Sequence, residues 1–187
     1  MQKKKLALIF PGIGYHKDKP LLYYAAKMAV RQGFEIVSVE YHDMPQKIRG
    51  NAEIMRTAAE LAIQQSREVL QNIPMHSDTN ILLIGKSIGT IAAAQIALES
   101  DADIRQIWYT PLEATYEFAS NHPCIAFIGE EDPWSDVRKL RNTAETLHIP
   151  TYGYPGCNHS LECGDVMRNL SILQDVMEKT KQFLESN

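Results

Sequence analysis

Ser87 lies in a five-residue segment, 85–89, that has the pattern G-x-S-x-G (GKSIG). The apolar run 81–84 before it has the length of a buried strand, and the Ala- and Ile-rich segment 90–98 after it contains good helix formers and no proline. A serine between a strand and a helix in this pattern sits on a strained turn, the nucleophile elbow, with its hydroxyl exposed above a sheet. The turn could also only pack tightly or bind a phosphate, but Asn80 stands where a phosphate loop would have its first glycine.

An acid and a base that could activate this serine follow two later apolar runs. Asp132 comes after the run 124–129, and His159 comes after the short run 151–154. A serine hydroxyl is a poor nucleophile at neutral pH, so a base must take its proton during attack. His159 suits this role because its ordinary pKa is near neutrality, and Asp132 would hold the other ring nitrogen. These residue types predict acyl transfer through a serine ester.

The oxyanion formed by such an attack needs hydrogen-bond donors. We expect them to be the backbone N–H of Ile88, directly after the serine, and that of Ile13 in the segment PGIG after the first apolar run. The glycines of that segment could instead only relieve crowding in a turn. Loss of one donor typically lowers the rate by about 10²- to 10³-fold.

Asp132 and His159 each have a simpler interpretation. Asp132 precedes Pro133 and could cap a helix that begins near Trp134, with Glu130 or Glu131 as the acid in its place. His159 could be an ordinary loop histidine.

Several residues near strand ends are candidates for a substrate pocket, namely Gly14, Tyr15, Tyr109 and Trp134. The aromatic ones, together with Trp108, could equally be half-buried side chains of the core.

Strands and helices alternate along the whole chain. Strands are predicted over 5–10, 35–41, 81–84, 104–109, 124–129 and 151–154. Helices are predicted over 20–32, from the N-cap Asn51 onward, after Ser87, and over 134–147 and 161–184. This alternation predicts an α/β fold with a doubly wound, six-stranded parallel sheet and helices on both faces. Ligands bind outside the carboxyl ends of such strands, so Ser87, Asp132 and His159 are expected at one edge.

Two of these helices carry apolar residues at nearly helical spacing, which indicates the faces that they bury. They are Ile54, Ala58, Leu61, Val69 and Ile73 in the long helix, and Val166, Leu170, Leu173, Met177 and Leu184 in the last one.

Length, charge and cysteine content limit the kinds of protein that this chain could be. A chain of 187 residues predicts a single domain over 1–187. A net charge of −4, without a cluster of Lys or Arg beyond the start, argues against nucleic acid as a partner, and no apolar run is long enough to span a membrane. The odd cysteine count, Cys124, Cys157 and Cys163, suits a reducing cytoplasm. Cys157 and Cys163 beside His159 lack a clear fourth ligand, so no metal and no cofactor are expected.

As a set, PGIG, GKSIG, GEEDPW and GCNHSLE resemble the corresponding segments of the α/β-hydrolases, in the chain order serine, acid, histidine. The resemblance covers nearly the whole chain and implies a minimal fold that lacks the usual first two strands. Only 13 residues separate Thr110 from Cys124, too few for a helical cap. The chain is most similar to small capless enzymes of the dienelactone-hydrolase-like or thioesterase-like kind.

The resemblance implies a serine hydrolase that cleaves an ester or thioester through an acyl-enzyme on Ser87, with Asp132 and His159 completing the triad. Its partner would be a small-molecule acyl substrate, with small or exposed acyl groups favoured by the open site. A non-catalytic binding protein with the same fold, and an acyltransferase or peptidase with the same triad, remain alternatives. The sequence does not specify an oligomeric state.

Overall fold

The six predicted strands form one parallel sheet in the computed structural model, which describes residues 4–71, 73, 75, 76 and 78–186. The strands are β1 (Lys4–Phe10), β2 (Glu35–Ser38), β3 (Thr79–Lys86), β4 (Asp103–Tyr109), β5 (Cys124–Gly129) and β6 (Thr151–Tyr154). Their order across the sheet is β2-β1-β3-β4-β5-β6, and every neighbouring pair is parallel. The predicted fold class is thereby confirmed.

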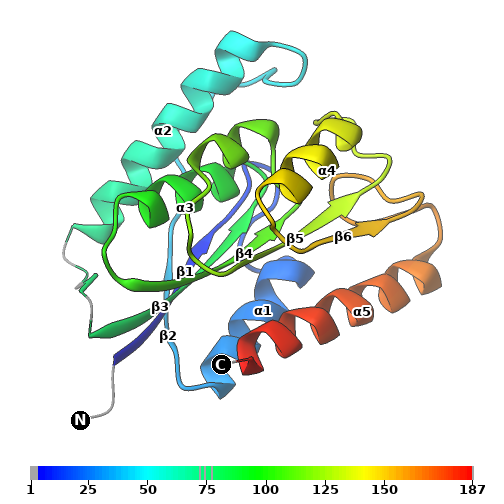
Figure 1. Cartoon of the computed structure of the whole chain (residues 1–187). Coiled ribbons are helices and arrows are strands. Elements are labelled where there is room, and N and C mark those ends of the chain that lie inside the picture. The colour runs from blue at the N-terminus through cyan, green and yellow to red at the C-terminus, as the bar shows by residue number, and fades with distance from the viewer. Residues whose placement is uncertain (1–3, 72, 74, 77, 187) are drawn as a thin grey trace.

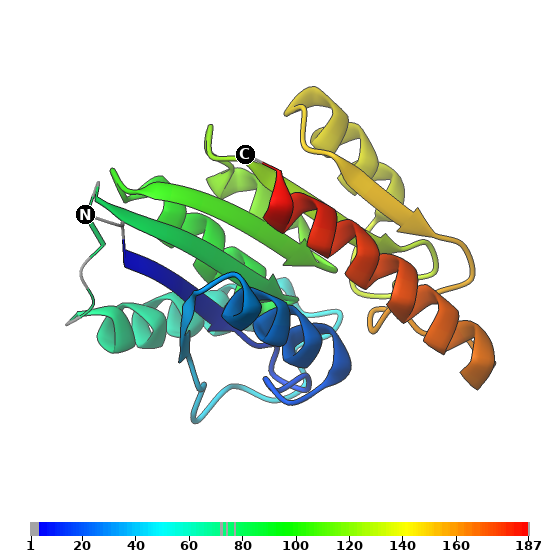
Figure 2. The ribbon, with the colours of Figure 1, turned by 90° about the horizontal axis from the view of Figure 1, so that it is seen from below.

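Helices cover both faces of the sheet (Figure 1). They are α1 (Pro20–Arg31), α2 (Ala52–Leu70), α3 (Ile88–Leu98), α4 (Val137–Thr146) and α5 (Val166–Glu185), with a short 3-10 helix, η1 (Glu113–Phe118). In Figure 1, α2, α3 and α4 lie on one face, and α1 and α5 lie side by side on the other, as Figure 2 also shows from below. Nothing larger than η1 stands between β4 and β5, so a helical cap is absent there.

Alternate residues of each strand fill the two layers of the core. In β1, Leu6, Leu8 and Phe10 pack toward α2 and α3, whereas Ala7 and Ile9 pack toward α1 and α5. Both faces are therefore buried, which explains why the central strands are continuously apolar instead of alternating with polar residues.

β3 is two residues longer at each end than predicted, and three other boundaries differ by three or more residues at places where local hydrogen bonds decide them. β2 ends at Ser38 instead of Tyr41, since the chain turns and the Tyr41 hydroxyl meets Ser66 Oγ on α2 at 3.3 Å. α4 begins at Val137, capped by Asp136, whose Oδ1 accepts from Lys139 N at 3.1 Å. α5 begins at Val166 after Asp165, which caps it in the same way.

The predicted apolar stripes are only partly correct. In α2, the buried face includes Ala58 and Leu70, so Val69 falls one residue out of phase and is exposed, and Ile73 lies past the helix end. In α5, Met177 and Leu184 are buried, but Val166 and Leu170 are 71% and 54% exposed. The first turns of α5 extend beyond the sheet edge, where no strand packs against them (Figure 2). None of the described helices is both long and apolar enough to cross a bilayer.

Candidate active site

Ser87 occupies a sharp turn between β3 and α3. Its φ of 55° and ψ of −125° are unfavourable for a residue with a side chain, and its N–H donates to the Tyr109 carbonyl of β4 at 3.0 Å. A Cβ on Gly89 would come within 2.2 Å of the Phe10 carbonyl oxygen, and one on Gly85 within 2.8 Å of Thr90 Cα. Only glycine allows α3 to start this close to β1 and β3, which holds the strained serine at the end of the sheet.

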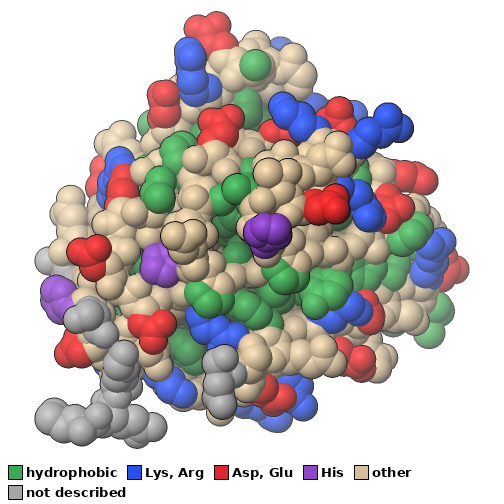
Figure 3. Space-filling view, viewed as in Figure 1, with side chains coloured by type: hydrophobic (Ala, Val, Ile, Leu, Met, Phe, Trp, Pro, Cys, Tyr) green, Lys and Arg blue, Asp and Glu red, His purple; other side chains and the backbone are tan. Residues whose placement is uncertain are grey.

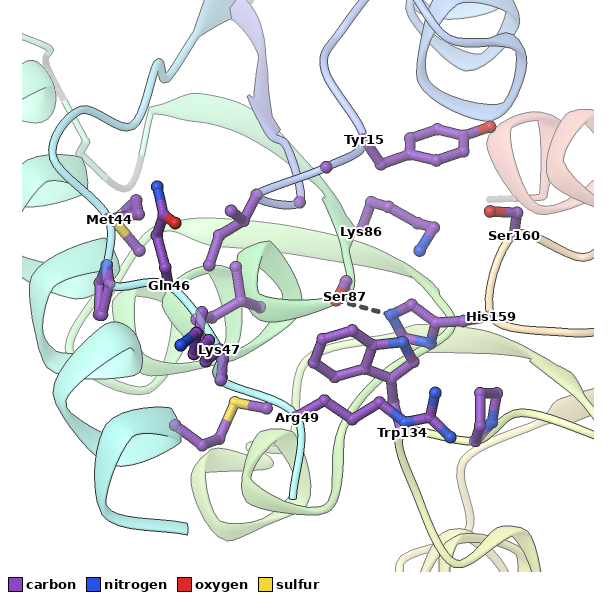
Figure 4. Close-up of a pocket in the computed structure, with 18 of the residues that line it drawn as sticks. Tyr15, Met44, Gln46, Lys47, Arg49, Lys86, Ser87, Trp134, His159 and Ser160 are labelled. Atoms are coloured by element: carbon purple, nitrogen blue, oxygen red, sulfur yellow. Dashed lines mark hydrogen bonds between the residues drawn. The ribbon is translucent and has the colours of Figure 1, made fainter. Parts of the chain in front are cut away.

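Ser87, His159 and Asp132 are hydrogen-bonded in a row. Ser87 Oγ lies 2.7 Å from His159 Nε2 (Figure 4), and His159 Nδ1 lies 2.6 Å from Asp132 Oδ2. With the ring proton on Nδ1, that nitrogen donates to Asp132 and Nε2 accepts from the serine. The other carboxylate oxygen of Asp132 accepts from Trp134 N at 2.9 Å, so the acid also supports the loop, although Asp136 is the residue that caps α4. Glu130, one of the two alternative acids, forms an ion pair with Arg141.

The loops that carry the acid and the base are joined to each other. Glu131 N donates to the Cys157 carbonyl at 2.9 Å, and a Cβ on Gly129 would lie 2.2 Å from the Asn158 carbonyl oxygen. The Asn158 side chain accepts from Ser160 N at 2.7 Å, which closes the turn around His159. This packing fixes the imidazole between the acid and the serine.

The imidazole is largely removed from water. The His159 side chain is 15% exposed and that of Asp132 only 2%. The Trp134 ring lies against the imidazole, with the two ring centroids 5.6 Å apart. Burial lowers the pKa of His159, the hydrogen bond that His159 donates to Asp132 opposes this, and the nearby Lys86 lowers the pKa further. The neutral form, the one that can accept a proton from Ser87, is therefore favoured.

We predict that kcat/KM for an ester rises with pH through a midpoint below 6.5, the ordinary pKa of histidine, because only neutral His159 can act as base. The Lys86→Met variant removes a neighbouring cation, so its midpoint should move to higher pH. Rates measured from pH 4.5 to 8 with a neutral ester test both parts. A wild-type midpoint above 6.5, or identical profiles for the two enzymes, would contradict the prediction.

The two predicted oxyanion donors flank the serine. Ile88 begins α3, so its N–H has no acceptor within the helix. Ile13 lies in the loop after β1, which is tightened by reciprocal bonds between Gly12 and Tyr15, 3.0 and 3.3 Å long. A Cβ on Gly12 would lie 3.2 Å from Ser87 Cβ. The hydrogen bonds found among the described residues include none from the amide of Ile13 or of Ile88. Both amides thus remain candidate donors, and both residues line the same cavity as Ser87.

A cavity of about 640 Å³ opens beside Ser87. Gly14, Tyr15 and Trp134, three of the four predicted pocket residues, line it. A further wall is the segment 44–49, in the loop between β2 and α2, which contains none of the motifs found in the sequence. The mixture of apolar and basic residues in this segment, MPQKIR, is the one feature of its sequence that could have indicated a role in the pocket.

Tyr109, the fourth residue predicted for the pocket, does not line this cavity. It is fully buried, its hydroxyl lies 2.7 Å from Thr180 Oγ1 on α5, and its ring stacks on Phe127. Trp108, on the other face of β4, is also core, with its indole N–H donating to Gln106. Both residues lie near a strand end, but the strand directs their side chains into the two core layers and away from the edge.

The cysteines near His159 are free thiols, with Cys157 buried and Cys163 partly exposed. Across the described residues, no group of three or more His, Cys, Asp or Glu is arranged to hold a metal ion.

Lys86, directly before the serine, has an unusual environment that sequence reasoning missed. Its side chain is 1% exposed, and its ammonium lies 4.9 Å from the centroid of the Tyr15 ring. In the part of the chain that the structure describes, no hydrogen bond or ion pair reaches this ammonium. Burial lowers the pKa of Lys86 to about 7. The charge of Asp132 opposes this shift, and the charge of Lys19 lowers the pKa further.

We predict that Lys86→Met makes the protein more stable at acidic and neutral pH. The folded protein holds Lys86 with a pKa of about 7, below the ordinary 10.5, so the unfolded chain binds more protons between these values. Wild-type stability should therefore rise with pH from about 7 to about 10, and the full cost of the charge is present below 7. The variant lacks this cost, and its Tm at pH 6 should exceed that of the wild type by about 5 °C or more. A difference that vanished or reversed at pH 6 would contradict the prediction.

A scan against models of known protein families finds no match, and a search of curated proteins finds none either. Solved structures do match over nearly the whole chain. An α/β serine hydrolase without a lid from Xanthomonas campestris is 14% identical, with a TM-score of 0.65, and the match covers 100% of this chain and 85% of that one. Esterase PE8 is 17% identical, with a TM-score of 0.69, and the match covers 97% of this chain and 91% of that one. An α/β serine hydrolase homologue from Coxiella burnetii is 15% identical, with a TM-score of 0.66, and the match covers 94% of this chain and 84% of that one. The protein thus has the α/β-hydrolase fold, in its lidless form.

Proposed function

We propose that the protein is a serine hydrolase that cleaves a carboxylic ester or thioester through an acyl-enzyme on Ser87. The observation that carries the proposal is the continuous contact from Ser87 through His159 to Asp132, with distances of 2.7 and 2.6 Å. Solved structures of the same fold include proteins named as hydrolases and esterases, which agrees with it.

The proposed reaction follows from this geometry. His159 Nε2 takes the hydroxyl proton while Ser87 Oγ forms a bond to the acyl carbon, and the carbonyl oxygen becomes an oxyanion held by Ile13 N–H and Ile88 N–H. The oxyanion collapses, the bond to the leaving oxygen or sulfur breaks, and the imidazolium gives that atom its proton. A water molecule, deprotonated by the same imidazole, then attacks the acyl-enzyme and releases the acid. Asp132 stabilises the imidazolium throughout.

The substrate of the proposed enzyme is a small acyl compound. No cap covers the serine between β4 and β5, and the cavity of about 640 Å³ is within the range of small-molecule sites.

A fluorophosphonate probe tests this proposal, because it reacts with a serine only where a base and an oxyanion site activate it. We expect one probe per chain, and digestion with mass spectrometry should place it on the peptide that contains Ser87. Heat-denatured protein serves as the control and should not react. Absence of labelling in folded protein would favour a binding protein that keeps the fold, and labelling of a different serine would refute the assignment.

A further inference from the structure

The cavity beside Ser87 contains a buried lysine that no carboxylate of the described residues pairs with, and its amine is mostly positively charged below pH 7. Lys86 lines this cavity although its side chain is 1% exposed. In Figure 4 it extends from the elbow between Tyr15 and His159, with its nitrogen toward His159 and Ser160. The carboxylates of Asp132 and Glu162 act on it only from a distance, since neither is hydrogen-bonded to it within the described structure. A buried ammonium with this environment is costly unless something anionic accompanies it.

The rest of the cavity adds further positive charge and no negative charge. Lys47 and Arg49 line it from the loop between β2 and α2, on the side of Ser87 away from Lys86 (Figure 4), and neither forms an ion pair with a described residue. No Asp or Glu is among the described residues that line the cavity. The chain as a whole has a net charge of −4, and both signs of charge are mixed over the face seen in Figure 3. The excess of positive charge is therefore a local property of this cavity.

Lys86 also affects the proposed reaction according to the charge of the substrate. During attack, His159 becomes an imidazolium, and the ammonium of Lys86 disfavours this second positive charge. A neutral ester leaves this repulsion in place. An ester with an anionic group beside Lys86 would offset it in the transition state, when the imidazolium forms, as well as on binding.

We propose that the natural substrate of this site carries a carboxylate, which pairs with Lys86 while Ser87 attacks the carbonyl carbon. This inference rests on the proposed function and names its substrate class. Lys47 and Arg49, at the outer side of the cavity, would attract the anion without contacting it as closely. Lys86 is thus a specificity-determining residue.

Two matched pairs of esters test the proposal, one with the carboxylate on the leaving group and one with it on the acyl group. In the first pair, 4-carboxyphenyl acetate and 4-carbamoylphenyl acetate place the carboxylate or its neutral amide on the leaving group. In the second, p-nitrophenyl 4-carboxybenzoate and its 4-carbamoyl analogue place it on the acyl group. Each pair is measured with the wild type, Lys86→Met and Lys86→Arg at pH 6.5. The ratio of kcat/KM values within a pair, compared between enzymes, cancels the intrinsic reactivity of each ester.

In at least one pair, we expect the wild type to prefer the anionic ester by about 10-fold or more relative to Lys86→Met, a change typical of a charge-assisted contact. Lys86→Arg should keep most of the preference. Lys27→Met, which removes an exposed lysine of α1, is the matched control and should retain it fully. Continued hydrolysis of the neutral esters by Lys86→Met shows that the variant is folded.

Equal ratios for the wild type and Lys86→Met in both pairs would overturn the inference, while Ser87-dependent hydrolysis of the neutral esters would leave the proposed function intact. If no ester is hydrolysed and the fluorophosphonate does not label Ser87, the proposed function itself fails. A preference lost only in a Lys47→Gln, Arg49→Gln double variant would also refute the role of Lys86.

Discussion

Replacing Ser87 with alanine is expected to lower the kcat of ester hydrolysis by about 10⁶-fold, the largest effect that we predict for a single substitution. The variant lacks the proposed nucleophilic oxygen, and no other serine hydroxyl among the described residues is hydrogen-bonded to His159. Residual hydrolysis would come from the cavity and the oxyanion donors acting on water. Steady-state rates with 4-carbamoylphenyl acetate, measured at enzyme concentrations high enough to detect slow turnover, give the value.

Ser171→Ala is the matched control for this variant. Ser171 lies on α5, where its hydroxyl donates to the Met167 carbonyl at 3.1 Å, and it should be replaceable without change in rate. The Ser87 variant should also keep its Tm, or increase it, because alanine removes a polar group from a strained turn. A loss of less than about 100-fold, with the fold intact, would mean that hydrolysis does not proceed through this hydroxyl.

The sequence predicted the sheet and the gathering of Ser87, Asp132 and His159 because both depend on local patterns. Apolar runs of four to six residues between helical segments require a parallel sheet, and parallel strands bring their carboxyl ends to one edge. The nucleophile elbow could also be predicted from the sequence, since Gly85 and Gly89 are needed where a strand and a helix meet this closely. No long-range information was needed for these inferences.

The remaining features of the site depend on which way side chains point. Tyr109 and Lys86 are paired across β3 and β4 and both follow the apolar positions that face α1 and α5. Counting alternate residues from Ile84 and Ile107 would have placed both in that layer, with Tyr109 in the core and Lys86 as a buried cation. The wall formed by 44–49 could not be found in this way, because an irregular loop has no periodicity that fixes its path.

Asp132→Asn is expected to lower kcat by about 10⁴-fold while the protein remains folded. An asparagine amide in place of Oδ2 would present N–H to His159 Nδ1, so that nitrogen must accept and the ring proton moves to Nε2. In this tautomer His159 cannot take a proton from Ser87. The asparagine oxygen can still accept from Trp134 N, as Asp132 Oδ1 does now at 2.9 Å, so the loop keeps its support. Ester hydrolysis and the rate of fluorophosphonate labelling should therefore fall together, at nearly constant Tm.

This variant also separates the two roles that Asp132 has in the structure. If Asp132 served only to support the loop before α4, the asparagine would be nearly neutral, since asparagine is as good an acceptor as aspartate in such turns. Asp136→Asn provides the comparison, because Asp136 caps α4 through Lys139 N at 3.1 Å and does not contact the imidazole. It should leave kcat unchanged. A small, equal effect of both substitutions would show that the carboxylate beside His159 supports the fold alone, and a large effect confined to Asp132→Asn would show that its charge orients and stabilises the base.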